Sequence, residues 1–238
     1  PVDDEHAEAE ETLTLNLVNG NYTLDGTQNQ ATVSIAANDT TAIATNDSAN
    51  NYTLREGSLR QALLNAIAFP GADTINFGGA AASGTINLTA ALPEISGTNA
   101  NNTTIDGPGA NRLTIKRDTG GNYRIFTIGN GVTATFNGLT IANGSEFNGG
   151  GIYNNGTVNV NDSTIKGNTA LGNSSGGGLY NMGGTVKISN STLSGNAAPG
   201  SNSGAISTNG EGTVTILNST IAENSTSLYG GAIANKGS

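Results

Sequence analysis

The chain has 238 residues, of which 11% are charged, 35 are glycine and 5 are proline. An ordinary domain carries about 25% charged residues and about 7% glycine, so this surface depends on uncharged polar groups. The low proline content excludes collagen, and the absence of cysteine excludes disulfides and Cys-ligated zinc. No apolar run reaches the roughly 18 residues that a membrane span needs.

The formal net charge of −9 lies mostly at the start of the chain. Six of the 18 acidic residues fall within residues 1–11, which leaves 12 acidic and 9 basic residues, a net charge of −3, for residues 12–238. A nearly neutral remainder argues against nucleic acid and anionic membranes as partners, because both require basic patches. A surface of amides and hydroxyls suits an extracellular or cell-surface protein, with polysaccharide or other cell-surface components as candidate partners.

Residues 1–40 predict a short antiparallel β segment. Residues 12–18 and 31–35 each alternate apolar and polar side chains, and Asn19–Gly20–Asn21 between them is a turn signal. No signal peptide begins the chain, which also lacks an initiator Met, so we expect a piece of a longer protein. Residues 41–51, rich in Thr, Ala and Asn, are expected to form a linker.

One helix is predicted, over residues 58–69. Ser58 and Gln61 form a capping-box pattern, apolar residues follow at helical spacing, and Pro70–Gly71 ends the helix. Stacked strands leave an exposed edge that invites aggregation, so we expect this helix to cap the strands that follow. A catalytic helix is the alternative, with Arg60 as its only ionisable residue.

Short strands fill the rest of the chain. Seven stretches between residues 74 and 141 alternate apolar and polar side chains. Three markers then recur every 27–28 residues. They are Gly149–Asn154, returning at 176–181, 203–206 and 230–233; Thr157–Val160, returning at 185–188 and 213–216; and Ser163–Ile165, returning at 191–193 and 219–221.

Three short strands in each repeat predict a parallel β-helix with three sheets along its length. The expected inward stacks are Ile165, Leu193 and Ile221; Ile152, Leu179, Ile206 and Ile233; and Val158/Val160, Val186/Ile188 and Val214/Ile216. Asn168, Asn196 and Asn224 recur at a turn, where we expect the left-handed conformation and hydrogen bonds between stacked copies.

A series of motifs runs in order from Ser58–Leu59–Arg60–Gln61–Ala62 through residues 70–77, 84–88, 104–110 and 138–141 to the Gly-Gly-Gly-Ile-Tyr-Asn repeats. This series resembles the SLREA-type right-handed β-helix family of bacterial surface proteins, which is found beside Pmp-like Gly-Gly-Ala-Ile repeats. Gly57 departs from the Cys that usually precedes the Ser. The resemblance implies an all-β, right-handed parallel β-helix over residues 52–238, secreted or displayed on the cell surface, with adhesion as the expected role.

Residues 2–39 resemble the last strands of a Calx-β domain through Asp3–Asp4, Glu8, Glu11–Thr12, Ile35 and Asp39. The resemblance implies calcium as a candidate cofactor, with Asp3, Asp4, Glu8 and Asp39 as candidate ligands, since hard carboxylate oxygens suit that ion. Most of such a domain is missing here. A solvated acidic run is the alternative interpretation.

Regular repeats, low charge and the lack of clustered reactive residues favour a non-catalytic structural or adhesive module. A polysaccharide-active enzyme of the pectin-lyase type is the alternative, by analogy of fold alone. Its chemistry requires paired carboxylates, or calcium with a basic residue. The one candidate region is Asp118 with Lys116, Arg117 and Arg124, because these residues form the only basic cluster. The single histidine, His6, lies outside the coil, so no His-based triad can form there.

A carbohydrate-binding module without catalysis is a further alternative. Tyr153 and Tyr180 occupy equivalent repeat positions and are candidate ligand-binding residues, because aromatic rings can hold sugars by flat contact. A stack that only stabilises the coil explains the same pair. Ice binding is disfavoured, because Thr133–Thr135 and Thr213–Thr215 look too scattered to form one threonine row.

Overall fold

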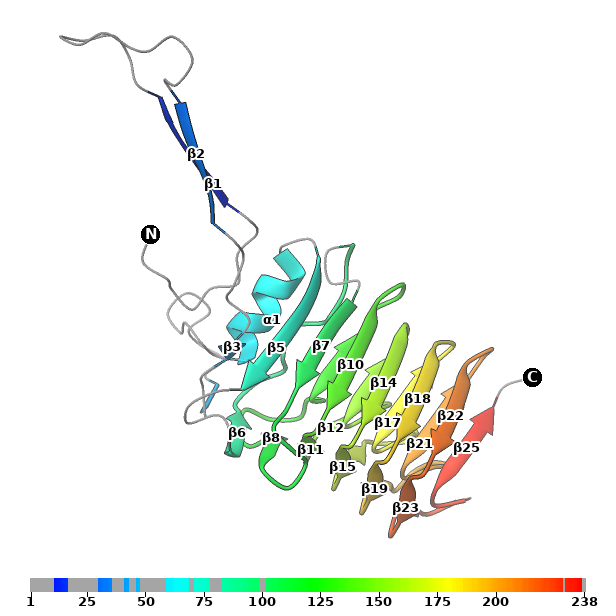
Figure 1. The fold of residues 1–238 in the computed structure, drawn as a ribbon. Coiled ribbons are helices and arrows are strands. Elements are labelled where there is room, and N and C mark those ends of the chain that lie inside the picture. Colours follow the sequence, from blue (N-terminus) through cyan, green and yellow to red (C-terminus); the bar gives the residue numbers. More distant parts are fainter. Residues whose placement is uncertain are drawn as a thin grey trace, which may run out of the picture.

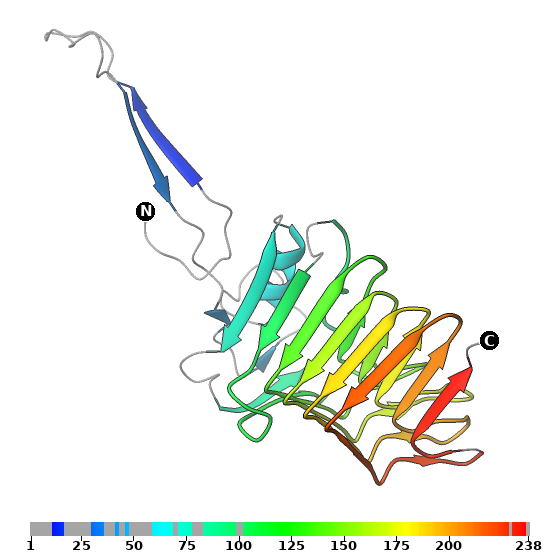
Figure 2. The same cartoon turned by 45° about the vertical axis from the view of Figure 1, so that its right-hand side comes forward.

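The computed structural model describes residues 11–16, 30–35, 41–42, 46–47, 59–68, 71–77, 83–98, 102–228 and 230–236. These residues are almost entirely β-structure, with one helix, α1 (Leu59–Ala68), near the N-terminal end. Strands stack in parallel into successive turns of a coil (Figures 1 and 2). The predicted parallel β-helix with an N-terminal helix is confirmed.

Four parallel sheets run along the coil, and we number them I to IV. Sheet I contains β3 (Thr41–Ala42), β5 (Ala72–Phe77), β7 (Asn102–Asp106), β10 (Thr133–Asn137), β14 (Thr157–Asn161), β18 (Thr185–Ser189) and β22 (Thr213–Leu217). Sheet II contains β4 (Asn46–Asp47), β6 (Gly84–Leu88), β8 (Leu113–Arg117), β11 (Thr140–Ala142), β15 (Thr164–Lys166), β19 (Thr192–Ser194) and β23 (Thr220–Ala222).

The two smaller sheets close the coil. Sheet III contains β12 (Ser145–Glu146), β16 (Thr169–Ala170), β20 (Ala197–Ala198) and β24 (Ser225–Thr226). Sheet IV contains β9 (Phe126–Ile128), β13 (Ile152–Asn154), β17 (Leu179–Met182), β21 (Ile206–Asn209) and β25 (Ile233–Lys236). The three strands predicted per repeat belong to sheets I, II and IV. The sequence did not predict sheet III, because its two-residue strands are too short to show alternation.

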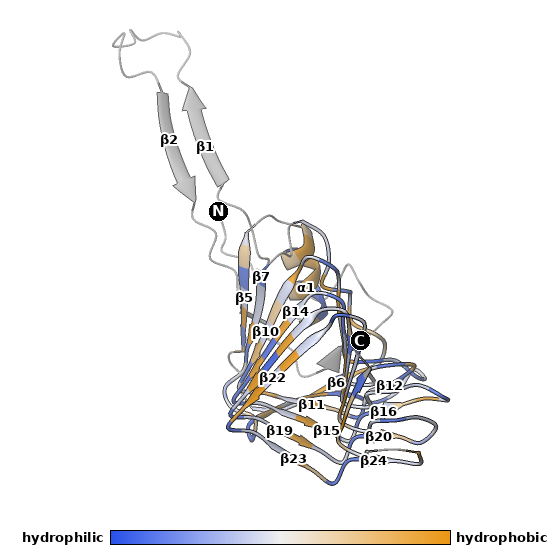
Figure 3. Cartoon of the chain, turned by 90° about the vertical axis from the view of Figure 1, so that its right-hand side faces the viewer, coloured by the Kyte–Doolittle hydropathy of each residue, from blue (hydrophilic) through white to orange (hydrophobic). Residues whose placement is uncertain are grey.

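Equivalent residues of successive coils pair in register, as the three predicted inward stacks require. Ile165 pairs with Leu193, and Ile152 with Leu179, and all four side chains are fully buried. Figure 3 looks along the coil, where the sheets enclose this apolar interior. Burial decreases in the last coil, where Ile233 is 43% exposed, because no further coil covers it among the described residues.

The N-terminal strands differ partly from expectation. β1 (Glu11–Asn16) and β2 (Gln30–Ile35) pair antiparallel, as predicted, while the turn expected at Asn19–Gly20–Asn21 lies outside the described residues. The expected linker over residues 41–51 contains β3 and β4, which pair in parallel with β5 and β6. Two dipeptides of that segment are therefore strands, too short for a periodic signal.

Helix α1 lies at the first turns of the coil (Figure 1) and packs Leu59 and Leu63 into the core. Arg60 is also buried, and its Nη1 and Nη2 donate to the carbonyl oxygens of Ala91 (2.6 Å) and Ala90 (3.1 Å). Gln61 donates to Asn65 Oδ1 (2.8 Å), whereas its expected capping partner Ser58 lies outside the described residues. No helix in the described part of the chain is long and apolar enough to cross a membrane.

A ladder of buried asparagines connects successive coils. The backbone N–H and the Nδ2 of Asn168 both donate to Asn196 Oδ1 at 3.0 Å, and Asn196 repeats the pattern on Asn224 Oδ1 at 2.9 Å. Asn196 Nδ2 also donates to the Ile165 carbonyl oxygen (2.9 Å). The predicted bonds between stacked copies are confirmed, and they satisfy turn groups that the fold removes from water.

The left-handed conformation expected for these asparagines is wrong. Positive φ angles occur one residue earlier, at Gly167 (63°), Gly195 (61°) and Glu223 (57°). An asparagine that follows the left-handed residue points its amide into the coil, where the ladder forms. Sequence spacing identified the turn but not which of two adjacent residues takes the unusual φ.

We expect Asn196→Ala to destabilise the fold by about 3 kcal/mol, because it leaves buried donors and an acceptor without partners, at about 1–3 kcal/mol each. The urea midpoint, followed by circular dichroism, measures this change. Asn155→Ala, at an exposed position of the preceding coil, is the control and should shift stability by less than about 0.5 kcal/mol. Equal midpoints for the two variants would contradict a stabilising ladder.

One acidic residue, Asp73, occupies an inward-facing position of the coil. Asp73 on β5 alternates with the buried Ile75 and Phe77, so it points inward, and it pairs in register with the buried Thr103. Its Oδ2 atom is buried and finds no hydrogen-bond partner among the described residues. Desolvation by burial raises the pKa of Asp73 above its ordinary value of 3.8.

Because the pKa of Asp73 is raised in the folded state, the contribution of this group to stability is greatest below pH 3.8 and falls as the pH rises from 3.8 through the folded-state pKa. We therefore expect Asp73→Asn, which mimics the neutral form, to raise the urea midpoint at pH 7. The gain should shrink as the pH is lowered through the pKa of Asp73. Glu211→Gln, at an exposed carboxylate, is the control. A lower midpoint for Asp73→Asn at pH 7 would show that the carboxylate is stabilising.

Candidate functional site

The outer face of sheet I presents uncharged polar side chains in rows, and we call it the polar face. Pairing in register aligns three rows across the strands from β5 to β22. The first row is Ala72, Asn102, Thr133, Thr157, Thr185 and Thr213; the second is Thr74, Thr104, Thr135, Asn159, Lys187 and Thr215; the third is Asn76, Asp106, Asn137, Asn161, Ser189 and Leu217. Alternation turns the apolar residues of the same strands inward, so the rows follow from the fold.

Hydrogen bonds link neighbours along these rows. In the third row Asn137 donates to Asp106 (3.2 Å), Asn161 to Asn137 (2.9 Å), and Ser189 to Asn161 (2.7 Å). In the second row Asn159 Nδ2 donates to Thr135 Oγ1 (3.2 Å). These bonds hold part of the face in fixed rotamers, which lowers the entropy lost when a ligand binds.

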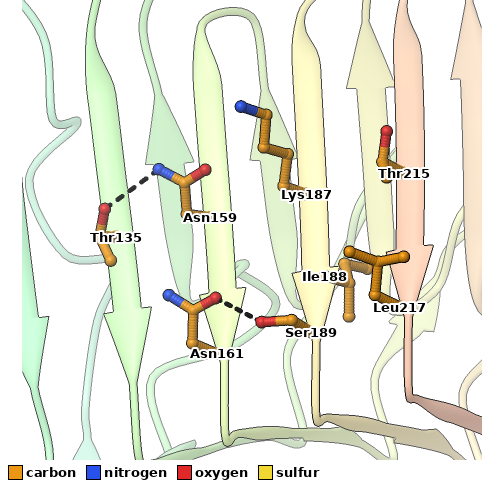
Figure 4. A pocket seen from close by; sticks show the side chains of 8 residues that line it. All are labelled: Thr135, Asn159, Asn161, Lys187, Ile188, Ser189, Thr215 and Leu217. Carbon is orange, nitrogen blue, oxygen red and sulfur yellow. Dashed lines mark hydrogen bonds between the residues drawn. The ribbon is translucent and has the colours of Figure 1, made fainter.

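A hollow of about 360 Å³ lies on the C-terminal half of the polar face. Its lining comes from β10, β14, β18 and β22 and comprises Thr135, Asn159, Asn161, Lys187, Ile188, Ser189, Thr215 and Leu217 (Figure 4). Lys187 stands between Asn159 on one side and Thr215 on the other. Hydroxyls, amides, one ammonium group and the apolar side chains of Ile188 and Leu217 therefore surround a single open space.

One repeat position in the sequence marks this site. The Thr157–Val160 marker and its copies place Asn159, Lys187 and Thr215 at one repeat position. These residues alternate with the inward-facing valines, so they lie on the outer face of the strands. Outward alignment could be inferred from that position. The hollow could not, because it depends on the different lengths of side chains on four strands.

The threonines judged too scattered for a row are in fact aligned. Thr133 and Thr213 both belong to the first row, and Thr135 and Thr215 to the second. Parallel pairing brings together residues that lie one coil apart in sequence. Lys187 interrupts the second row. On sheet II, Thr140 is buried and donates a hydrogen bond to the Ala110 carbonyl oxygen. The first row keeps four successive threonines, Thr133, Thr157, Thr185 and Thr213, but no second threonine row runs beside it on the described strands of sheet I.

Tyr153 and Tyr180 lie together on the outer face of sheet IV. They pair in register, and their rings stack with centroids 5.7 Å apart and planes 22° apart. Arg124 reaches the Tyr153 ring from the β9 side, with its Cζ 4.7 Å from the centroid. Tyr180 is only 8% exposed, and Asn209 donates to its hydroxyl (3.3 Å). Because sugars need an open ring face, this geometry favours a stabilising stack.

The basic cluster near Asp118 is engaged in loop contacts. Lys116 Nζ lies 3.6 Å from Asp118 Oδ1, and Arg117 donates to the carbonyl oxygens of Asn143 (2.8 Å) and Gly121 (3.1 Å). Arg124 Nη2 donates to the Phe147 carbonyl oxygen (2.8 Å). Burial lowers the pKa of Arg124, with Glu146 acting in the opposite direction.

This cluster contains a single carboxylate, Asp118, and not the pair that glycoside hydrolysis requires. Over the described ranges, no three acidic or histidine side chains gather as metal ligands. The candidate calcium ligands Asp3, Asp4, Glu8 and Asp39, together with His6, lie outside the residues that the structure describes.

Comparisons of the chain with protein-family models, with curated proteins and with solved structures gave no match. The resemblances to the SLREA-type and Calx-β families therefore stay predictions. Functional argument rests on the geometry of the coil and its polar face.

Proposed function

We propose that this chain is a secreted or cell-surface structural module that adheres to polysaccharide through the polar face of sheet I, without catalysis. The observation that supports this role is the alignment of hydroxyl and amide side chains across six strands, with the hollow at Lys187 among them. Sugar hydroxyls both donate and accept hydrogen bonds, and so do Thr, Ser and Asn side chains. A chain of sugars laid along the coil would meet equivalent groups at every turn.

The same face offers little to a hydrolase or lyase. Asp106 is the only carboxylate on the outward positions of the described strands of sheet I, and its Oδ1 accepts from Asn137. Glycoside hydrolysis uses two carboxyl groups across one bond, and lyase chemistry uses a base beside a cation. Adhesion requires only a stable, repeated set of hydrogen-bonding groups.

The stacked architecture suits a module that carries load. Each strand in the interior of the stack pairs with a strand on both sides, and buried ladders repeat the connection at the turns. Weak contacts repeated along such a rod add through multivalency, because every contact after the first is intramolecular. Individually modest hydrogen bonds can thereby hold a polymer.

The test is retention on a panel of immobilised neutral and acidic polysaccharides, with product analysis in parallel. We expect retention without reducing or unsaturated products. The double variant Asn159→Ala/Thr215→Ala should weaken retention about 5- to 150-fold, because it removes two hydrogen-bonding side chains and each net hydrogen bond contributes about 0.5–1.5 kcal/mol.

Two controls separate the faces of the coil. Thr164→Ala/Thr192→Ala alters outward positions of sheet II and should leave retention unchanged. Tyr153→Ala removes the aromatic stack and should lower stability while retention persists. Sugar products, or loss of retention only with Tyr153→Ala, would overturn the proposal.

A further inference from the structure

We infer that the hollow on the polar face binds an anionic saccharide, with Lys187 contacting its carboxylate or sulfate group. This inference rests on the proposed function and specifies its ligand. Lys187 is the only cation on the outward positions of the described strands of sheet I. It lines the hollow from the centre of β18.

The ammonium group of Lys187 has no partner among the residues that the structure describes. The side chain is exposed, and it makes no hydrogen bond or ion pair with any residue that the structure describes. Lys116 differs, because its Nζ lies 3.6 Å from Asp118 Oδ1, whereas Lys166 is exposed like Lys187 but lies on sheet II, outside the hollow. A cation that the fold does not neutralise is available to an external anion.

The net charge of the chain does not oppose an anion here. Asp106 is three strands away from Lys187, about 14 Å at about 4.8 Å per strand, beyond the Debye length of about 8 Å at physiological ionic strength. Two further carboxylates lie in turns at the ends of the strands. Asp162 is three residues after Asn159, and Glu211 is four residues before Thr215, so each is about 10 Å or more from the hollow at about 3.3 Å per residue. The potential at the hollow is therefore set mainly by Lys187.

Neutral groups around the cation favour a sugar over a simple ion. Asn159 and Thr215 flank Lys187 across the sheet, and Thr185 and Ser189 flank it along β18. An anion held by the ammonium group would place its ring hydroxyls beside these four side chains. A lone lysine among hydroxyls and amides thus matches a carboxylated or sulfated saccharide.

The test compares wild type, Lys187→Gln and Lys166→Gln for binding to four immobilised polymers by biolayer interferometry. The polymers are polygalacturonate, its carboxyl-reduced neutral form, dextran sulfate and dextran. Lys166 is the matched control, an exposed outward lysine on sheet II. Far-UV circular dichroism verifies that both variants keep the fold.

We expect wild type to prefer an acidic polymer over its neutral counterpart, with a preference that weakens as salt is added. Lys187→Gln should lower the affinity for the acidic polymer about two- to five-fold, to the level of the neutral polymer, while Lys166→Gln leaves it unchanged. If the binding of polygalacturonate depends on Lys187, the anion is a carboxylate. If the binding of dextran sulfate depends on Lys187, the anion is a sulfate ester.

Three outcomes would overturn the inference. If wild type binds acidic and neutral polymers equally, or if Lys187→Gln keeps the acidic preference, the anion site is wrong while the polysaccharide role stands. If wild type binds none of the four polymers and no polymer of the wider panel, the proposed function is wrong together with the inference.

Discussion

Register between coils is the constraint on which the rest of this structure depends. Parallel pairing places every residue beside its counterpart one coil away, at about 4.8 Å. A one-residue slip would turn Val158 and Val186 outward and Asn159 and Lys187 inward. Buried asparagines at the turns oppose such a slip, because each amide must meet the next one to be satisfied. Gly150 and Gly177 allow close packing, since a Cβ at either would collide with the backbone of sheet III.

The same constraint generates the polar face. Once the apolar stacks are fixed inside, the outward positions of sheet I align without further information, and their chemistry is free to vary. Thr and Asn dominate these positions, yet one coil carries Lys187 and another carries Asp106. Variation of this kind costs the fold little because the side chains face solvent. A candidate ligand site can therefore arise on a regular scaffold from a single substitution within a repeat.

Periodicity explains both what the sequence could predict and what it could not. The inward stacks around Ile165 and Ile152 and the capping helix followed from repeat spacing and helical patterning. Two-residue strands such as β3 and β12 carry no alternation, so they were missed. The exact left-handed residue beside Asn168 and the contacts of Arg124 with Tyr153 and Phe147 depend on three-dimensional packing. The hollow at Lys187 belongs to the same class, since it requires four strands at once.

The most direct test of the central claim is to locate the polysaccharide on the coil. Because the chain has no cysteine, single cysteines at Thr157 on sheet I, Thr164 on sheet II and Thr127 on sheet IV can each carry an environment-sensitive fluorophore. The account predicts that a polymer retained by the protein changes the emission of the Thr157 probe alone. A response at Thr164 or Thr127 with none at Thr157 would contradict it.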